Sequence, residues 1–94
     1  MRRIALHRHA RNYFQRRPRD RQTQVRAALQ AVAALPDPAS SPNVRPMSGE
    51  WVECLRLRVG SYRVVLRVIP PELPDAPDGT LEVLVIGPRG DVYK

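Results

Sequence analysis

Two alternating segments joined at Gly60-Ser61 constrain the fold more than any other feature of this chain. In both segments, which together span residues 54–68, apolar residues alternate with polar or charged ones, and the polar positions are mostly arginine. Successive side chains of a strand point to opposite faces, so this alternation places the apolar residues on one face and the arginines on the other. A two-residue Gly-Ser loop is typical of a type II′ hairpin turn. The sequence therefore predicts a β-hairpin with one apolar face and one cationic face.

The position of the turn also predicts the cross-strand pairs. These are Val59–Tyr62, Arg58–Arg63, Leu57–Val64, Arg56–Val65, Leu55–Leu66 and Cys54–Arg67. The cationic face then carries Arg56, Arg58, Arg63 and Arg67. Like charges placed opposite each other destabilise a sheet by a few tenths of a kcal/mol or more. Such a concentration of arginines is explained most simply by an anionic partner.

Composition supports the same interpretation. The chain has 94 residues, enough for one domain over residues 1–94 and too few for a second core. It carries fifteen arginines, one lysine and a formal charge of +7. Guanidinium groups bind phosphates through paired donors, which favours a nucleic-acid-facing protein over an enzyme of small metabolites. A GC-rich coding bias would also raise the arginine content, but it would not place arginines on one sheet face.

Cysteine and histidine usage excludes several classes of site. The single cysteine, Cys54, cannot form an internal disulfide, and no apolar stretch is long enough for a signal sequence or a membrane span. We therefore expect a reduced, cytoplasmic protein with no membrane partner. Cys54 has no base partner at a spacing that suggests a nucleophile, and His7 and His9 add no recognisable metal-ligand set. No metal and no cofactor are expected.

The remaining pattern predicts two helices followed by the three later strands. Residues 3–6 form a short apolar run that suits an edge strand. Helical periodicity follows over residues 7–16, is interrupted by Pro18, and resumes up to Leu35. A proline-rich surface connection (36–49), strands at 50–59 and 62–69, a long loop (70–80), a largely apolar strand (81–86) and a short tail complete the expected order.

This order, β-α-α-β-β-β, predicts an α+β domain in which an antiparallel helical hairpin packs on a small antiparallel sheet. One residue conflicts with the predicted alternation. Glu53 falls on the apolar face of the strand predicted over residues 50–59, so that strand must extend past the core there or carry a bulge. Tyr62 is expected to pack in the core beside Val59. Trp51 is expected to pack in the core or against a loop more readily than to act as a platform for a nucleobase.

Three motifs carry a resemblance to a known family. They are Asn-Val-Arg-Pro-Met-Ser-Gly (43–49) leading into Trp51, Leu-Arg-Leu-Arg-Val-Gly-Ser-Tyr-Arg-Val-Val (55–65), and Ile-Gly-Pro-Arg-Gly-Asp-Val-Tyr (86–93). With the element order, they make nearly the whole chain resemble the RelE/ParE toxin superfamily of bacterial toxin-antitoxin systems. RelE-type members cut messenger RNA in the ribosomal A site, whereas ParE-type members inhibit DNA gyrase on the same scaffold. The resemblance implies a toxin restrained by a cognate antitoxin, which we expect to be acidic.

RNA cleavage by attack of the 2′-hydroxyl needs a base, positive charge at the phosphate and an acid for the leaving oxygen. Resemblance to RelE-type enzymes implies catalytic roles for Arg63 at the scissile phosphate, Arg56 in binding and orienting it, Arg89 at the leaving oxygen and Tyr93 in stacking or proton transfer. Tyr93 is the best available base, because neighbouring guanidinium groups should lower a phenol pKa from about 10. Further RNA contacts are expected from Arg58, Arg67, Arg45 and Lys94.

The chain also departs from the family pattern. Many RelE-type enzymes have lysines on the second strand, where this chain has Cys54 and Arg56, and arginine is a poor proton shuttle. Pro88 and Gly90 stand where related toxins often have histidine and arginine. The preferred interpretation is a ribosome-dependent endoribonuclease with the ribosome and mRNA as partners. A ParE-like gyrase inhibitor and a non-catalytic RNA- or DNA-binding module remain alternatives, although the latter does not explain the combination of Arg89 and Tyr93.

Overall fold

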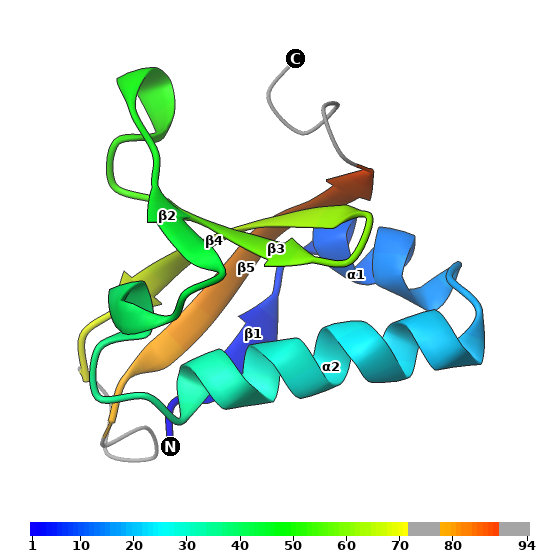
Figure 1. The fold of residues 1–94 in the computed structure, drawn as a ribbon, viewed down its shortest axis with the longest axis horizontal. Helices are drawn as coiled ribbons and strands as arrows, with labels where there is room; N and C mark the ends of the chain where they lie inside the picture. The colour runs from blue at the N-terminus through cyan, green and yellow to red at the C-terminus, as the bar shows by residue number, and fades with distance from the viewer. Residues whose placement is uncertain (72–77, 89–94) are drawn as a thin grey trace.

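The chain folds into two helices that lie on one face of a five-stranded sheet (Figure 1). The structure, a computed structural model, describes residues 1–71 and 78–88. The strands are β1 (Arg3–Leu6), β2 (Val44–Pro46), β3 (Leu55–Val59), β4 (Tyr62–Ile69) and β5 (Thr80–Pro88), and the helices are α1 (Arg8–Gln15) and α2 (Arg19–Ala33). Short 3-10 helices span Pro38–Ser40 and Gly49–Trp51. The strand order β1-β5-β4-β3-β2 confirms the α+β class and the position of β1 at a sheet edge.

The sheet is mixed, so the prediction of an antiparallel sheet was wrong for β1, which pairs with β5 in parallel. Hairpin alternation determines the directions of β3 and β4 relative to each other, but it carries no information about how the first strand meets the last. The surface connection predicted over residues 36–49 was wrong in part, since it contains β2. Pro46 lacks an N–H and is tolerated there because β2 is the other edge strand.

The β3–β4 hairpin confirms the predicted register from Leu55–Leu66 to Val59–Tyr62. Gly60 has φ of 57°, and no described non-glycine residue has a positive φ, which fits a type II′ turn and excludes type I′. The first strand of the hairpin is shorter than predicted. It begins at Leu55, so Cys54 precedes it and Glu53 lies in the turn before it. The conflict over Glu53 disappears because that residue is outside the strand.

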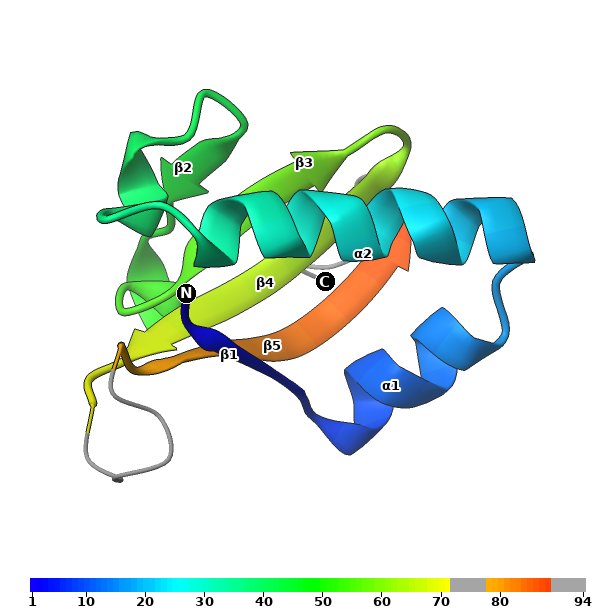
Figure 2. The same cartoon turned by 90° about the horizontal axis from the view of Figure 1, so that it is seen from below.

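The main core lies between the helices and the sheet. As predicted, α1 contributes the fully buried Ala10 with Tyr13 and Phe14, and α2 buries Val25, Leu29 and Val32. Fully burying one such valine or leucine stabilises the fold by about 1.5–3 kcal/mol. In Figure 2 α2 crosses in front of the sheet, while α1 lies beside β1 and β5.

The chain reverses between the helices at Pro18, which cannot continue α1 because it has no N–H to donate. The side-chain amide of Gln22 donates to the carbonyl oxygens of Arg17 (2.9 Å) and Gln15 (3.2 Å). These bonds occupy acceptors that the end of α1 leaves open and hold the reversal in place.

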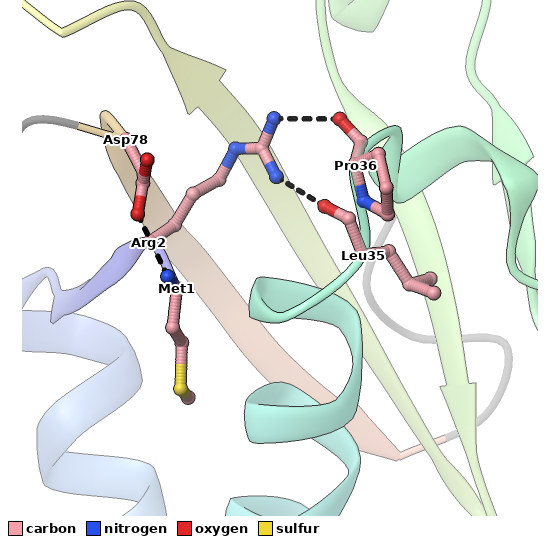
Figure 3. Close-up of polar contacts among 5 residues, drawn as sticks. All are labelled: Met1, Arg2, Leu35, Pro36 and Asp78. Carbon is pink, nitrogen blue, oxygen red and sulfur yellow. Dashed lines mark hydrogen bonds and ion pairs between the residues drawn. The ribbon is translucent and has the colours of Figure 1, made fainter.

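Polar contacts at the N-terminus fasten β1 to the rest of the fold (Figure 3). The terminal amino group of Met1 forms an ion pair with Asp78 at 2.7 Å. The guanidinium of Arg2 donates to the carbonyl oxygens of Leu35 (2.5 Å) and Pro36 (3.0 Å) just after α2. A cation at the carboxyl end of a helix satisfies open acceptors and interacts favourably with the helix dipole.

Candidate nucleic-acid interface

The sheet face opposite the helices, which we call the open face, carries an arginine pocket at its β2–β3–β4 end. This pocket is a shallow hollow of about 360 Å³. It is lined by Pro42, Asn43, Arg45, Arg56, Arg58 and Arg63. Four guanidinium groups from three adjacent strands therefore converge on one hollow, and none of these six lining residues is acidic.

Strand register explains why the arginines meet. Arg58 on β3 stands directly opposite Arg63 on β4, and Arg56 stands opposite Arg45 on β2. Opposed residues of an antiparallel pair have side chains on the same face, close enough for two like charges to repel. The backbone N–H of Arg58 donates to the carbonyl of Asn43 at 2.9 Å, which holds the segment before β2 against β3.

The four arginines differ in burial. Arg45, Arg56 and Arg58 are exposed, whereas Arg63 is only 8% exposed and donates to the carbonyl oxygen of Tyr62 at 3.3 Å. Arg63 therefore has the most restricted side chain in the arginine pocket, while the others are more accessible to solvent. A fixed guanidinium with mobile cationic neighbours is suited to binding an anionic oxygen, since arginine stays protonated throughout the physiological range.

The opposite end of the open face holds an ion-paired group formed by His7, Arg67 and Glu82. Arg67 donates to Glu82 at 2.5 Å, and Nε2 of His7 lies 3.3 Å from the same carboxylate oxygen. Burial tends to raise the pKa of Glu82, but hydrogen bonds from Arg67 and His7 outweigh it and hold that pKa below its ordinary value. Arg67 does not line the arginine pocket, so the structure separates it from Arg45 and Arg58, two other predicted RNA-binding residues.

A small apolar patch lies between the two ends of the open face. Cys54 and Val65 are buried in it and are covered by Met47, Trp51, Leu84 and Val85. A bulge between β4 and β5 adds one residue there, because Val65 pairs with Val85 while Leu66 pairs with Val83. Burial raises the pKa of the Cys54 thiol despite the nearby cation of Arg67. A raised pKa fits the expectation that Cys54 is not a nucleophile.

Three predicted site residues, Arg89, Tyr93 and Lys94, lie outside the described residues. Tyr62 packs against the core, as predicted. It also meets Tyr13 edge to face, with ring centroids 6.2 Å apart. The sequence pattern did not indicate the apolar patch, because neither the bulge nor the fold of the segment around Trp51 follows from strand alternation.

The described part of the chain holds no cluster of three or more histidine, cysteine or acidic side chains arranged to hold a metal ion. Its helices are also too short or too polar to cross a membrane.

Comparison with known families identifies a match over nearly the whole chain. The model described as "ParE toxin of type II toxin-antitoxin system, parDE" matches residues 5–93. No curated protein matches the chain.

Several solved structures have a similar fold. The archaeal RelE-RelB complex from Pyrococcus horikoshii has 22% identity and a TM-score of 0.68, with 96% of this chain and 97% of that chain covered. The RelBE2 toxin-antitoxin complex from Mycobacterium tuberculosis has 21% identity, a TM-score of 0.71 and coverage of 96% and 93%. The intact Escherichia coli RelBE complex has 18% identity, a TM-score of 0.65 and coverage of 94% and 96%.

Proposed function

The chain belongs to the ParE toxin family of type II toxin-antitoxin systems, and from this premise we propose that it is a ribosome-dependent endoribonuclease that cleaves mRNA. Family membership alone does not decide the activity, because one scaffold can carry unrelated functions. The choice between them rests on the chemistry of the open face.

The observation that carries the proposal is the convergence of Arg45, Arg56, Arg58 and Arg63 in the arginine pocket. Attack of a 2′-hydroxyl on the adjacent phosphate builds negative charge on the phosphate oxygens, and fixed cations stabilise that charge. Arg63 is the most restricted of the four and would contact the scissile phosphate. Arg56 and Arg58, on the neighbouring strand, would bind and orient it, and Arg45 would contact the flanking backbone.

The carboxyl-terminal tail supplies the base and a leaving-group cation in this proposal. Tyr93 would accept the proton of the 2′-hydroxyl as that oxygen bonds to phosphorus, Arg89 would stabilise the charge on the departing 5′-oxygen, which takes its proton from water, and Lys94 would contact the RNA backbone. Guanidinium groups stabilise a phenolate, so Tyr93 could act as a base below the ordinary pKa of tyrosine. Tyr93→Phe keeps the ring and removes the hydroxyl. It should lower single-turnover cleavage on programmed ribosomes by about 10²- to 10⁴-fold. An unchanged rate would leave Tyr93 as a stacking residue and the base unidentified.

An antitoxin is the expected protein partner. The three neighbours above were solved as toxin-antitoxin complexes, and a chain of charge +7 suits a partner rich in carboxylates. We propose that an acidic segment of the antitoxin covers the arginine pocket, so antitoxin binding should reduce RNA binding there. Undiminished RNA cleavage by the saturated complex would contradict this overlap.

Gyrase inhibition is the second candidate, and the match to the ParE family model favours it. A gyrase inhibitor would use the arginine pocket to hold a protein or DNA surface and would carry out no chemistry of its own. The two candidates differ in which process fails first: an endoribonuclease stops protein synthesis first, and a gyrase inhibitor stops DNA synthesis first.

The experiment is brief induction in bacteria with separate pulse-labelling of protein and DNA. An endoribonuclease stops protein labelling first, and Arg56→Ala should restore it. Arg11→Ala is the matched control, since Arg11 is an exposed arginine on α1 outside the arginine pocket and its loss changes the charge equally. Prompt failure of DNA labelling with protein labelling intact would favour gyrase inhibition.

A further inference from the structure

A second hollow on the open face adjoins the arginine pocket and has a different chemistry. It measures about 370 Å³ and is lined by Pro46, Met47, Ser48, Trp51 and Arg56. Arg56 lines both hollows, so the two are neighbours on either side of one arginine side chain. One hollow is dominated by charge, and the other combines an aromatic ring, a thioether and a proline ring with that shared cation.

Trp51 is held in this hollow by local structure. It ends the 3-10 helix Gly49–Trp51, which begins at a glycine with φ of 68°. Its carbonyl accepts from the N–H of Cys54 at 2.8 Å, and the N–H of Met47 donates to the carbonyl of Cys54 at 3.2 Å. These backbone bonds tie the segment to the start of β3, so the main chain that carries the indole needs little further ordering when a ligand binds.

The indole is only partly covered by the protein. It packs on the apolar patch around Cys54 and Val65, yet it keeps intermediate exposure and lines the open hollow. A planar, partly exposed ring beside a cation is the arrangement with which proteins stack unpaired bases.

We propose that this hollow is a nucleobase pocket, in which Trp51 stacks on an unpaired base of the RNA whose phosphate occupies the arginine pocket. The proposal rests on the proposed function for the identity of the ligand as RNA. Arg56 joins the two subsites and can contact the phosphate between them. Met47 and Pro46 supply further apolar surface, and Ser48 adds a polar side chain to the lining.

Trp51 is the only tryptophan in the chain, so its fluorescence reports the pocket directly. The probe is 2′-O-methyl hexaadenylate, which lacks the attacking hydroxyl and cannot be cleaved by this chemistry. The control ligand is an abasic oligomer of the same length and charge. Hexaadenylate should quench the fluorescence and bind more tightly, whereas the abasic oligomer should bind through its phosphates with little quenching.

Two variants separate stacking from packing. Trp51→Leu keeps an apolar side chain on the patch but removes the aromatic ring, and Trp51→Phe keeps a smaller ring. Because both variants lack the tryptophan, their affinities are measured by the fluorescence anisotropy of end-labelled oligomers. We expect Trp51→Leu to weaken hexaadenylate binding about tenfold and leave abasic binding unchanged, and Trp51→Phe to lose much less. Melting temperatures of both variants check that each is folded.

The outcomes are distinct. Equal affinities of the Leu and Phe variants, or equal quenching by both oligomers, would overturn the base pocket. If equal quenching or equal affinities are found but Arg58→Ala weakens the binding of both oligomers, the base pocket is wrong and the proposed function is not contradicted. If neither oligomer binds, the base pocket is overturned, while cleavage on programmed ribosomes decides the proposed function separately. Quenching by an antitoxin peptide and none by hexaadenylate would also overturn the proposal and assign the hollow to a protein.

Discussion

The two ends of the open face use arginine in opposite ways. At one end Arg67 faces Glu82, and the carboxylate also receives His7. At the other end Arg58 faces Arg63, and the neighbouring cross-strand pair is also two arginines. Both arrangements lie on the same side of one sheet, so general surface composition does not explain the difference.

The comparison indicates which charges serve the fold. An arginine beside a carboxylate contributes to stability, whereas two arginines placed opposite each other reduce it by a few tenths of a kcal/mol or more. The core between the helices and the sheet tolerates that cost. A surface that concentrates one charge is a candidate for binding the opposite charge, and here this points to the arginine pocket rather than to Arg67.

The largest effect is expected when the arginine pair on β3 and β4 is replaced by an arginine-carboxylate pair. Arg58→Glu places a carboxylate opposite Arg63, so it should raise the melting temperature by a few degrees. The same change removes a cation from the anion site and adds repulsion, which should weaken RNA binding by about 2–5 kcal/mol. Thermal melting and oligonucleotide titration measure the two effects. Destabilisation with intact binding would contradict both halves of the comparison.

The reverse experiment removes the pair at the other end. Glu82→Gln leaves Arg67 and His7 without their carboxylate, and loss of these partly buried hydrogen bonds should lower the free energy of unfolding by about 1–2 kcal/mol. The melting temperature should fall by roughly 4–8 °C per kcal/mol in a domain of this size. Cleavage measured below the melting transition should stay within a few-fold of wild type. Loss of cleavage with unchanged melting would place this end in the functional site.

A smaller effect is expected from pH. Because the pKa of Glu82 is lowered in the folded state, its contribution is present above the ordinary value of about 4.5 and is lost as pH falls through the folded value. The difference in melting temperature between wild type and Glu82→Gln should therefore shrink as pH is lowered from about 6 to about 3. A constant difference across that range would mean that Glu82 stabilises through packing. Asp78, whose pKa is lowered by the Met1 amino group, affects both proteins alike.

Much of the fold could be predicted from the sequence because the signals are local. The alternation around Gly60 determines the hairpin, and Pro18 separates two helices with clear apolar faces. The edge strand β2 gave no such signal, since three residues beside prolines do not show a period. Because β2 was not predicted, its cross-strand pairing of Arg45 with Arg56 was not predicted either.

For residues of the candidate site, the sequence predicted which face of the sheet a side chain lies on more easily than which side chains it contacts. Alternation put Arg67 on the same face as Arg63, which the strand bears out. Its pairing with Glu82 depends on the β4–β5 register, and that register includes a bulge which the sequence pattern does not specify. The structure therefore separates one predicted contact from the arginine pocket for a reason that only long-range pairing supplies.

The most direct test of the arginine pocket is single-turnover cleavage of end-labelled mRNA on ribosomes with an empty A site. Arg63→Ala should lower the rate about 10²- to 10³-fold, the range expected for loss of one group that stabilises transition-state charge. Arg67→Ala is the matched control from the other end of the same strand and should cleave at a rate within a few-fold of wild type. Equal losses in the two variants, or no cleavage by the wild-type protein, would contradict the account.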